Sequence, residues 1–237
     1  MGGLISIPVC LAGKLLRIPI ELYELNVEPG KAVNFLSKFV SKINICFDET
    51  EKYFPFKKCN LVSYPIRFSE SEKKLSKLEA IKKINLSEDK KTILILGGSQ
   101  GSVFINNLFK DFILQNNNIN NKIQVIHQTG SDKFDWELLY KENLICAITF
   151  DFSDNIEQYY LAADIVVCRS GAGSLSEILF FQKKCITIPL EINSNNHQLL
   201  NAKSLEKKHP DLFCVLRQSD VTKNPNLFSE KIKKTAF

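Results

Sequence analysis

The chain has 237 residues, of which 44% are hydrophobic and 24% are charged. This length and composition predict an ordinary globular protein with one large domain, or one domain and part of another, and exclude disordered and fibrous classes. The net charge of +5 is modest: it suits anionic phosphates or an anionic membrane surface, and equally a solvated lysine-rich surface. We expect no nucleic-acid partner.

The cysteine pattern gives no sign of a disulfide framework or a metal site. The seven cysteines are odd in number, form no Cys-X-X-Cys pair and lie partly in apolar runs such as residues 165–168. We interpret them as small buried hydrophobic residues in a reducing compartment. No stretch approaches the roughly 20 apolar residues of a spanning helix, and no signal peptide opens the chain. The sequence therefore predicts a cytoplasmic protein that can still touch a membrane surface.

Helix and strand are expected to alternate in the first part of the chain. Apolar spacing predicts helices over residues 8–16 and 31–42 and strands over residues 18–22 and 43–47. A looser stretch over residues 48–65 contains prolines and a cluster of lysines. We expect a domain boundary there, with one domain over residues 1–60 and a second over residues 61–237.

The alternation becomes more regular after a Lys- and Glu-rich segment, residues 69–84, which we interpret as a surface helix or hinge. Strands are expected over residues 92–96, 123–127, 144–149, 165–167, 185–188 and 213–216. Helices are expected over residues 102–114, 133–141, 155–163, 172–181 and 196–207, and a loop over the Asn-rich residues 116–121. Largely apolar strands that alternate with helices predict a parallel sheet covered on both faces. Ligands of such sheets bind beyond the carboxyl ends of the strands.

Two glycine-rich loops follow predicted strands and open predicted helices. The first reads Gly97-Gly98-Ser99-Gln100-Gly101 and would let backbone N–H groups approach a phosphate, although a plain tight turn has the same composition. The second includes Arg169, Ser170 and Gly171, and Glu177 lies one to two turns into the following helix. A carboxylate there can bind a ribose diol. The alternatives are a solvated helix residue for Glu177 and a surface salt bridge for Arg169.

Two further strand ends carry polar residues. The run from Ser194 to Gln198 supplies amides that suit sugar hydroxyls, or simply cap a helix. His127 ends another strand, and a lone histidine is more often structural than catalytic. Arg67 lies near the expected boundary and could reach a phosphate or base, or be a surface charge. Together, these loops on one sheet edge point to a nucleotide that carries a sugar; an NAD-dependent oxidoreductase is disfavoured because no GxGxxG is present.

These motifs, taken in order, resemble a known family. The matching segments are Gly97–Gly101 with Asn106, residues 127–130, residues 168–172 with Ser176 and Glu177, residues 196–198 with 201–203, and upstream Gly2, Gly3, residues 12–16, 18–19, Glu24, Asn26 and Pro29-Gly30. Together they are similar to the bacterial transferases that add N-acetylglucosamine from UDP-N-acetylglucosamine to undecaprenyl-pyrophosphoryl-muramyl-pentapeptide in peptidoglycan synthesis. The similarity extends over nearly the whole chain.

The resemblance implies an α/β fold of the GT-B type, with a nearly complete C-terminal Rossmann-like donor domain and the last part of an N-terminal Rossmann-like acceptor domain. It implies inversion at the anomeric carbon without a metal ion or other cofactor, at the cytoplasmic face of the inner membrane, to which the protein would bind peripherally. The donor-binding residues it implies are Arg67, Ser99, Gln100, Gly101, Phe152, Ser153, Ser170, Gly171, Glu177, His197 and Gln198. On the acceptor side it implies Gly2, Gly3 and Asn26, with Glu24 as the one titratable candidate for the catalytic base.

The sequence also departs from the family pattern. The opening glycine-rich loop with its histidine is absent, and Tyr23 and Leu25 stand where the family has His and Gln. The missing part could be a separate chain, the gene could be degenerate, or the sequence could be a fragment. The alternative function is therefore a non-catalytic or partner-dependent nucleotide-sugar-binding subunit.

Residues 31–42 are the candidate membrane contact. Val33, Leu36, Phe39, Val40 and Ile43 would form an apolar stripe flanked by Lys31, Lys38 and Lys42. Such a helix can lie on an anionic membrane, or it can equally face the protein core.

Overall fold

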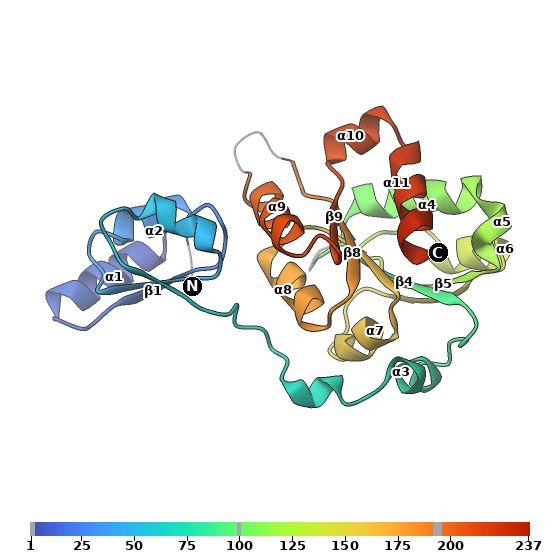
Figure 1. Ribbon diagram of the computed structural model, residues 1–237, viewed down its shortest axis with the longest axis horizontal. Coiled ribbons are helices and arrows are strands. Elements are labelled where there is room, and N and C mark those ends of the chain that lie inside the picture. Colours follow the sequence, from blue (N-terminus) through green and yellow to red (C-terminus); the bar gives the residue numbers. More distant parts are fainter. Residues whose placement is uncertain (1–2, 99–100, 192–195) are drawn as a thin grey trace.

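The computed structural model describes residues 3–98, 101–191 and 196–237, which form two lobes (Figure 1). We call residues 3–61 the N-lobe and the described residues from 62 on the C-lobe. An extended linker leaves the N-lobe and runs beneath the C-lobe before entering it (Figure 1). The expected boundary between residues 60 and 61 falls at the end of the last N-lobe strand, and the division into two domains stays a prediction.

The N-lobe is built on a small parallel sheet. Its strands are β1 (Glu21–Glu24), β2 (Lys42–Ile45) and β3 (Cys59–Leu61), in the order β1-β2-β3, and its helices are α1 (Ser6–Leu15), α2 (Lys31–Leu36) and the 3₁₀ helix η1 (Asp48–Tyr53). The first strand begins three residues later than expected, and α2 ends at Leu36, well short of residue 42. β3 and η1 lie in the stretch that was expected to be irregular, because their apolar runs are too short to show a period.

The predicted membrane stripe is wrong, and its alternative, a core-facing helix, is confirmed. Leu36, Val40 and Ile43 are all buried in the N-lobe core, and Val33 packs against that core. One exposed apolar surface of this lobe lies instead on α1 and the residues next to it, and no residue of α1 is buried. It includes Leu4, Ile5, Val9, Leu15 and Leu16. No helix among the described residues is long and apolar enough to cross a membrane.

The C-lobe contains a six-stranded parallel sheet in the order β6-β5-β4-β7-β8-β9. The strands are β4 (Lys91–Leu96), β5 (Ile123–Gln128), β6 (Cys146–Phe150), β7 (Ile165–Cys168), β8 (Lys184–Thr187) and β9 (Phe213–Val215). The helices are α3 (Lys77–Lys83), α4 (Val103–Gln115), α5 (Asn117–Asn120), α6 (Trp136–Glu142), α7 (Ile156–Ala162), α8 (Ala172–Phe180), α9 (His197–Lys208), α10 (Gln218–Lys223) and α11 (Asn226–Ala236), with the 3₁₀ helix η2 (Glu70–Lys73) in the linker. The predicted sheet and the expected α/β fold are confirmed; α5 replaces the loop expected in the Asn-rich tract.

Both faces of this sheet are buried, which explains why its strands are almost continuously apolar. In β4, Ile93 and Ile95 face a core shared with α4, α6 and α11, whereas Leu94 and Leu96 face a second core shared with α3, α7 and α8. The two layers of helices are visible on either side of the sheet in Figure 1. A sheet held in this way presents its strand ends on a rigid edge.

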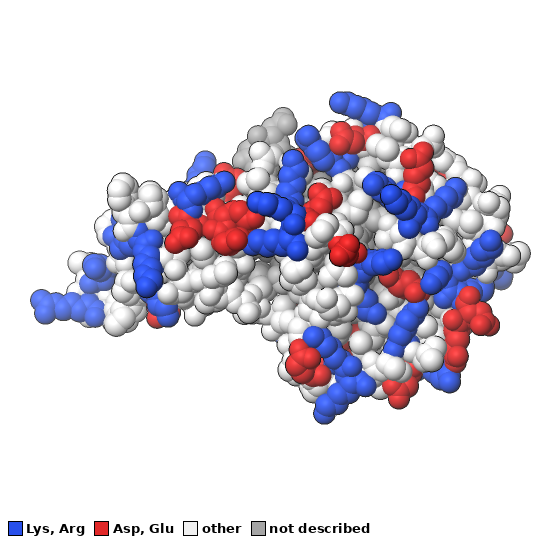
Figure 2. Space-filling model, viewed as in Figure 1, with Lys and Arg blue, Asp and Glu red and all other residues white. Residues whose placement is uncertain are grey.

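Charged side chains are mixed on the surface. On the face shown in Figure 2, lysines and arginines lie among aspartates and glutamates over both lobes, without one large patch of a single sign. This distribution agrees with the small net charge of +5.

Candidate functional site

The four polar loops predicted from the sequence meet at one edge of the C-lobe sheet. Strands β5, β4, β7 and β8 are parallel neighbours, so the loops after their carboxyl ends lie side by side. Two of the loops are in direct contact: a Cβ on Gly101, whose φ is +76°, would lie 2.9 Å from the Cα of Gly130. No side chain fits at position 101 without moving that backbone. The expected convergence of the loops is confirmed.

The loop between β7 and α8 is held by buried polar contacts. Ser170 is fully buried, and its hydroxyl lies 2.6 Å from that of Thr187 on β8. Its backbone N–H donates to Oε1 of Gln198 (3.2 Å), which also accepts from the N–H of Leu190 (2.9 Å). Gln198 on α9 therefore ties the loops after β7 and β8 together. Gly171 caps α8, and a Cβ there would meet no atom within 4 Å, so the start of α8 opens onto free space.

Glu177 and Arg67, predicted separately from distant parts of the sequence, form an ion pair. Arg67 Nε lies 3.6 Å from Glu177 Oε1, and the Tyr160 hydroxyl donates to Oε2 at 3.0 Å. The Glu177 side chain is 18% exposed, so it is not the solvated helix residue of the alternative interpretation. Burial raises the pKa of Glu177, against the opposing effects of Tyr160 and Arg67. The carboxylate remains accessible, beside a cation, one turn below the open start of α8.

The side chains of Arg169 and His127 are held by hydrogen bonds to other protein groups. Arg169 donates to the Ser102 hydroxyl (3.0 Å), the Ile188 carbonyl (3.2 Å) and Gln218 Oε1 (2.8 Å), so it joins three loops instead of forming a surface salt bridge. His127 is fully buried, with ring nitrogens 2.8 Å from the Tyr140 hydroxyl and 3.1 Å from Asn106 Oδ1. Burial lowers the pKa of His127 to about 3, so the ring is neutral.

Other predicted donor residues are not tied to this cluster. Phe152 is 66% exposed, and the Ser153 hydroxyl accepts from the N–H of Asn155 within its own turn. Their proposed contact with a base stays a prediction. Ser99, Gln100 and Gly2 lie outside the described residues, as does Ser194. 

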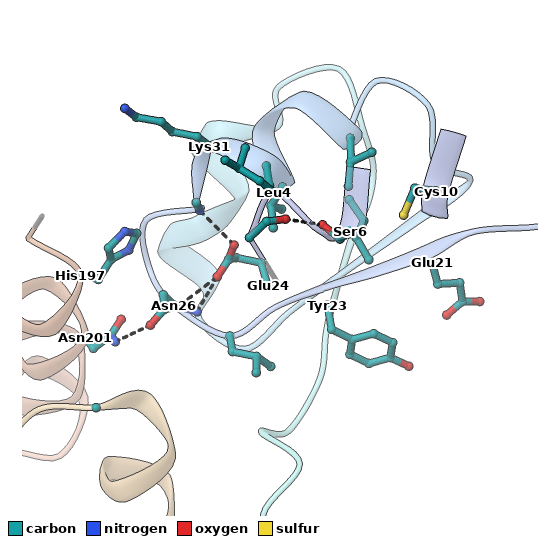
Figure 3. Close-up of a pocket in the computed structure, with 18 of the residues that line it drawn as sticks. Leu4, Ser6, Cys10, Glu21, Tyr23, Glu24, Asn26, Lys31, His197 and Asn201 are labelled. Atoms are coloured by element: carbon teal, nitrogen blue, oxygen red, sulfur yellow. Dashed lines mark hydrogen bonds between the residues drawn. The ribbon is translucent and has the colours of Figure 1, made fainter. Parts of the chain in front are cut away.

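A cavity of about 980 Å³ lies between the lobes (Figure 3). Gly171, His197 and Gln198 line it from the C-lobe, and His197 faces it across from Glu24 in the close-up. The acceptor-side residues predicted from the sequence, Gly3, Glu24 and Asn26, line it from the N-lobe. The cavity continues along β1 and beneath α1, where its walls become apolar: Leu4, Val9, Leu22, Val33 and Leu36.

The hydrogen bonds of the Glu24 carboxylate are to residues of the loop that follows β1. Glu24 is 3% exposed; Oε1 accepts from the backbone N–H and the side-chain amide of Asn26 (2.9 and 3.2 Å), and Oε2 accepts from the N–H of Gly30 (3.3 Å). This arrangement favours a role in positioning residues 26–30. Its assignment as the catalytic base stays a prediction.

Sequence reasoning gave no separate role to Asn201, which connects the lobes. Asn201 on α9 is 1% exposed; its Oδ1 accepts from the N–H of Val27 (2.9 Å), and its Nδ2 donates to Asn26 Oδ1 (3.0 Å). Further along α9, the Ser204 hydroxyl bonds Glu49 (2.8 Å) and Lys208 pairs with Asp48. The sequence signal for this role is that Asn201 lies about one turn after Gln198 on the same helix.

Replacing Asn201 with alanine should release the lobes from each other. The variant leaves the Val27 N–H and the Asn26 amide oxygen without their partner, and a buried unpaired group costs about 1–3 kcal/mol. We expect a loss of that size in the free energy of unfolding by urea, and faster proteolysis of the linker over residues 62–69. Asn107→Ala, at an exposed position of α4 whose side chain makes no hydrogen bond to a described residue, is the matched control and should change neither measurement. An Asn201 variant as stable as the control would show that the interlobe bonds carry no net energy.

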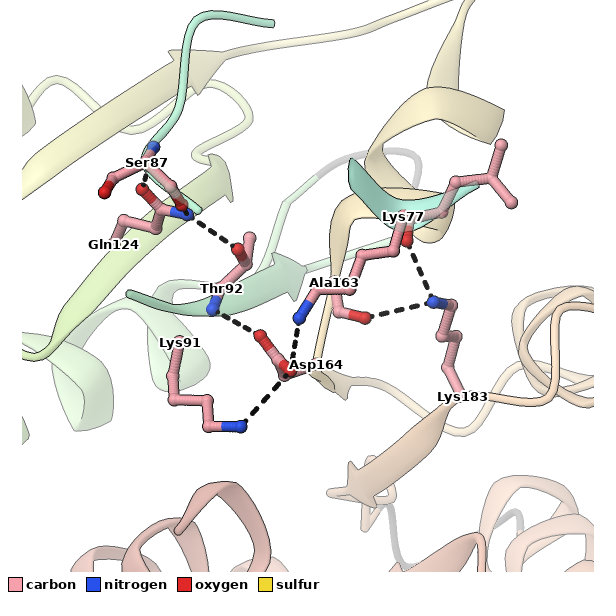
Figure 4. A network of polar contacts seen from close by, with 9 residues as sticks. Lys77, Ser87, Lys91, Thr92, Gln124, Ala163, Asp164 and Lys183 are labelled. Carbon is pink, nitrogen blue, oxygen red and sulfur yellow. Dashed lines mark hydrogen bonds and ion pairs between the residues drawn. The ribbon is translucent and has the colours of Figure 1, made fainter. Parts of the chain in front are cut away.

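A second polar cluster lies at the opposite edge of the sheet (Figure 4). Asp164 accepts from the N–H of Thr92 at 2.8 Å and pairs with Lys77 and Lys91. Lys183 donates to the carbonyls of Leu161 (2.9 Å) and Ala163 (3.1 Å), and burial, with repulsion from Lys77, lowers its pKa to about 8. Lys77 thus attaches α3 to the sheet, and Lys183 attaches β8 to the end of α7, both far from the loops.

Comparison with known proteins identifies the family. The family model described as the glycosyltransferase family 28 C-terminal domain matches residues 92–236. The chain belongs to glycosyltransferase family 28. The matched range begins in β4 and ends in α11, so it contains all the loops that surround Glu177 and Gln198.

Curated relatives within this family match most of the chain. The UDP-N-acetylglucosamine–N-acetylmuramyl-(pentapeptide) pyrophosphoryl-undecaprenol N-acetylglucosamine transferase of Aquifex aeolicus is 34% identical over 246 residues, covering 98% of this chain and 68% of that protein. The transferase of the same name from Thermodesulfovibrio yellowstonii is 36% identical over 206 residues, covering 86% of this chain and 56% of that protein. The family 28 chain thus spans between 56% and 68% of the length of these relatives.

Solved structures support the fold. The crystal structure of Acinetobacter baumannii MurG matches 99% of this chain and 62% of that protein, with a TM-score of 0.76 and 24% sequence identity. The calicheamicin glycosyltransferase CalG4 matches 95% of this chain with a TM-score of 0.54 and 10% identity. The expected GT-B-type arrangement of Rossmann-like sheets is confirmed for this family 28 chain.

Proposed function

We propose that this chain is the donor-binding part of an inverting transferase that moves N-acetylglucosamine from UDP-N-acetylglucosamine to undecaprenyl-pyrophosphoryl-muramyl-pentapeptide in peptidoglycan synthesis. The observation that carries the proposal is the Arg67–Glu177 pair beside the open start of α8, at the edge where Gln198 joins two loops. The names of the relatives that match most of the chain agree with it.

Each part of this edge suits one part of the donor. The Glu177 carboxylate would accept hydrogen bonds from both ribose hydroxyls, and Arg67 would lie against the nucleotide. The backbone N–H groups that follow Gly171 at the start of α8, together with the helix dipole, would bind the diphosphate and stabilise its charge as UDP leaves. Gln198 and His197, which line the cavity, would contact the sugar, and Phe152 and Ser153 would meet the uracil. Ser99 and Gln100, which lie outside the described residues, would add contacts to the diphosphate together with Gly101.

The acceptor would enter from the N-lobe side of the cavity. Gly2, Gly3 and Asn26 would contact it, with Glu24 as the candidate base or, as its bonds favour, the group that holds the acceptor loop in place. Because the acceptor is lipid-linked, the protein would act as a peripheral membrane protein at the cytoplasmic face of the inner membrane. Attack by the acceptor hydroxyl on the anomeric carbon, opposite the departing UDP, would invert the configuration at that carbon.

We further propose that another polypeptide segment, for example from a separate chain, packs on the N-lobe and completes its sheet. Within the described residues β1 pairs only with β2, so one edge of β1 is left open, and α1 beside it has no buried residue. The cavity runs along this same edge. The second candidate function is a nucleotide-sugar-binding subunit that transfers sugar only together with a partner, and these observations are compatible with it.

The proposal is tested by titrating the purified chain with UDP-N-acetylglucosamine, UDP-glucose and UDP in a calorimeter. We expect binding of all three, with a preference for the N-acetylated sugar. A folded chain that binds none of them would refute the donor site. Transfer to a lipid-linked acceptor, assayed with the chain alone and after addition of a partner chain, then separates the complete enzyme from the partner-dependent subunit.

A further inference from the structure

Tyr64 occupies an unusual position over the first turn of α8. It lies in the linker, shortly after β3, yet its hydroxyl is 3.3 Å and its Cζ 3.7 Å from the point where a Cβ on Gly173 would stand. The ring is partly buried against the C-lobe core. Glycine within a helix is less stable than alanine. Gly173, the second residue of α8, therefore provides the space that the phenol ring fills.

The Tyr64 hydroxyl is placed among groups already assigned to the donor. Gly173 precedes Glu177 by four residues, which is about 6 Å along a helix axis, in the direction of the capping residue Gly171. The hydroxyl thus lies between the ribose-binding carboxylate and the open start of the helix. It makes no hydrogen bond to any described part of the chain, so its donor capacity is available to a ligand.

The state of this hydroxyl suits a hydrogen-bond donor. Burial raises the pKa of Tyr64, and interactions with the Cys46 thiol and the Glu177 carboxylate add to that effect. The phenol therefore keeps its proton at neutral and moderately alkaline pH. Phosphate oxygens can only accept hydrogen bonds, so they need a donor such as this hydroxyl. The ribose hydroxyls already have the Glu177 carboxylate as their partner.

We propose that the Tyr64 hydroxyl binds the donor by donating a hydrogen bond to the diphosphate. The contact would lie between the ribose, bound at Glu177, and the start of α8. This inference rests on the proposed function and adds a specificity-determining residue to that site. It also gives the linker between the lobes a direct contact with the nucleotide, alongside Arg67 three residues later.

The first test compares Tyr64→Phe with the unchanged chain in titrations with UDP and with uridine. Phenylalanine keeps the ring packing and removes only the hydroxyl, so we expect about 10-fold weaker binding of UDP and unchanged binding of uridine. Tyr53→Phe, in the N-lobe helix η1, is the matched control and should bind both ligands normally. Equal losses for UDP and uridine would place the contact on the nucleoside and overturn the proposal, as would no loss at all. An unchanged chain that binds no UDP would instead refute the donor site itself.

The second test uses Gly173→Ala in both backgrounds. The new Cβ would stand 3.3 Å from the Tyr64 hydroxyl, and we expect it to displace the phenol and weaken UDP binding several-fold. In the Tyr64→Phe chain the nearest remaining ring atoms are at 3.7 and 3.9 Å, so the same substitution should have little further effect. This non-additivity is the signature of direct coupling. Equal losses in the two backgrounds would show that the methyl group acts on the ligand or the helix, and not through Tyr64.

Discussion

Replacing Glu177 with glutamine should lower the affinity of the chain for UDP by about 10- to 100-fold, because hydrogen bonds to a charged group contribute about 1.5–3 kcal/mol. The glutamine amide is the same size and keeps an oxygen that can accept from Tyr160, which bonds Glu177 at 3.0 Å. The fold should therefore survive, with a circular dichroism spectrum and melting temperature close to those of the unchanged chain. Calorimetric titration with UDP measures the loss.

The assignment to the ribose can be separated from a general effect of charge. The unchanged chain should bind UDP more tightly than 2′-deoxy-UDP, and the Glu177 variant should no longer distinguish the two nucleotides. Glu157→Gln, on α7, is a matched control that removes the same charge from a neighbouring helix. If the variant lost affinity but still discriminated against the deoxynucleotide, Glu177 would act on another part of the ligand.

The stability of the C-lobe should depend on pH through His127, and the effect should be large. Burial lowers the folded-state pKa of His127 to about 3, below the unfolded value of about 6.5. Between these values the unfolded chain binds a proton that the folded chain does not. The stabilisation is thus complete above about pH 6.5, and it is lost as the pH falls toward 3, by about 1.4 kcal/mol per pH unit.

This contribution can be measured by difference, since carboxylates also titrate in that range. His127→Gln retains an amide that can bond Tyr140 and Asn106 but cannot take up a proton in this range. Its free energy of unfolding by urea should be lower at pH 7, because the replaced ring also packs against Trp136, and the gap to the unchanged chain should close as the pH falls to 4.5. A gap that stays constant with pH would mean that His127 takes up its proton in the folded chain as readily as in the unfolded chain.

The C-lobe and its loops were predictable because local sequence determines them. Apolar runs such as residues 92–96 could only be buried strands, and small residues such as Gly171 marked the turns into helices. Parallel pairing then requires the loops to lie on one edge. The pairing of Arg67 with Glu177 could not be derived in this way, because it depends on the path of a linker with no periodic pattern.

Some features depend on tertiary contacts, and the sequence alone left them open or predicted them incorrectly. Leu36 and Val40 suited a membrane face and a core equally well, and only the position of the N-lobe sheet buries them. Asn201 and Arg169 are ordinary polar residues in the sequence; their partners lie on other elements that no spacing rule brings together. The last helices, α10 and α11, were not predicted, although Phe228 and Ile232 recur at helical spacing and fill the core beneath α4.

α9 contacts the loops after β7 and β8 at one end and the N-lobe along the rest of its length. Gln198 in its first turn bonds the loops after β7 and β8, and Asn201 and Ser204 bond the N-lobe. A helix of 12 residues moves as a unit, so a displacement at its first turn is transmitted to the interlobe contacts. If donor binding strengthens those contacts by some factor, thermodynamic linkage requires that closure of the lobes strengthen donor binding by the same factor. Donor binding and closure of the lobes would then be coupled through this one helix.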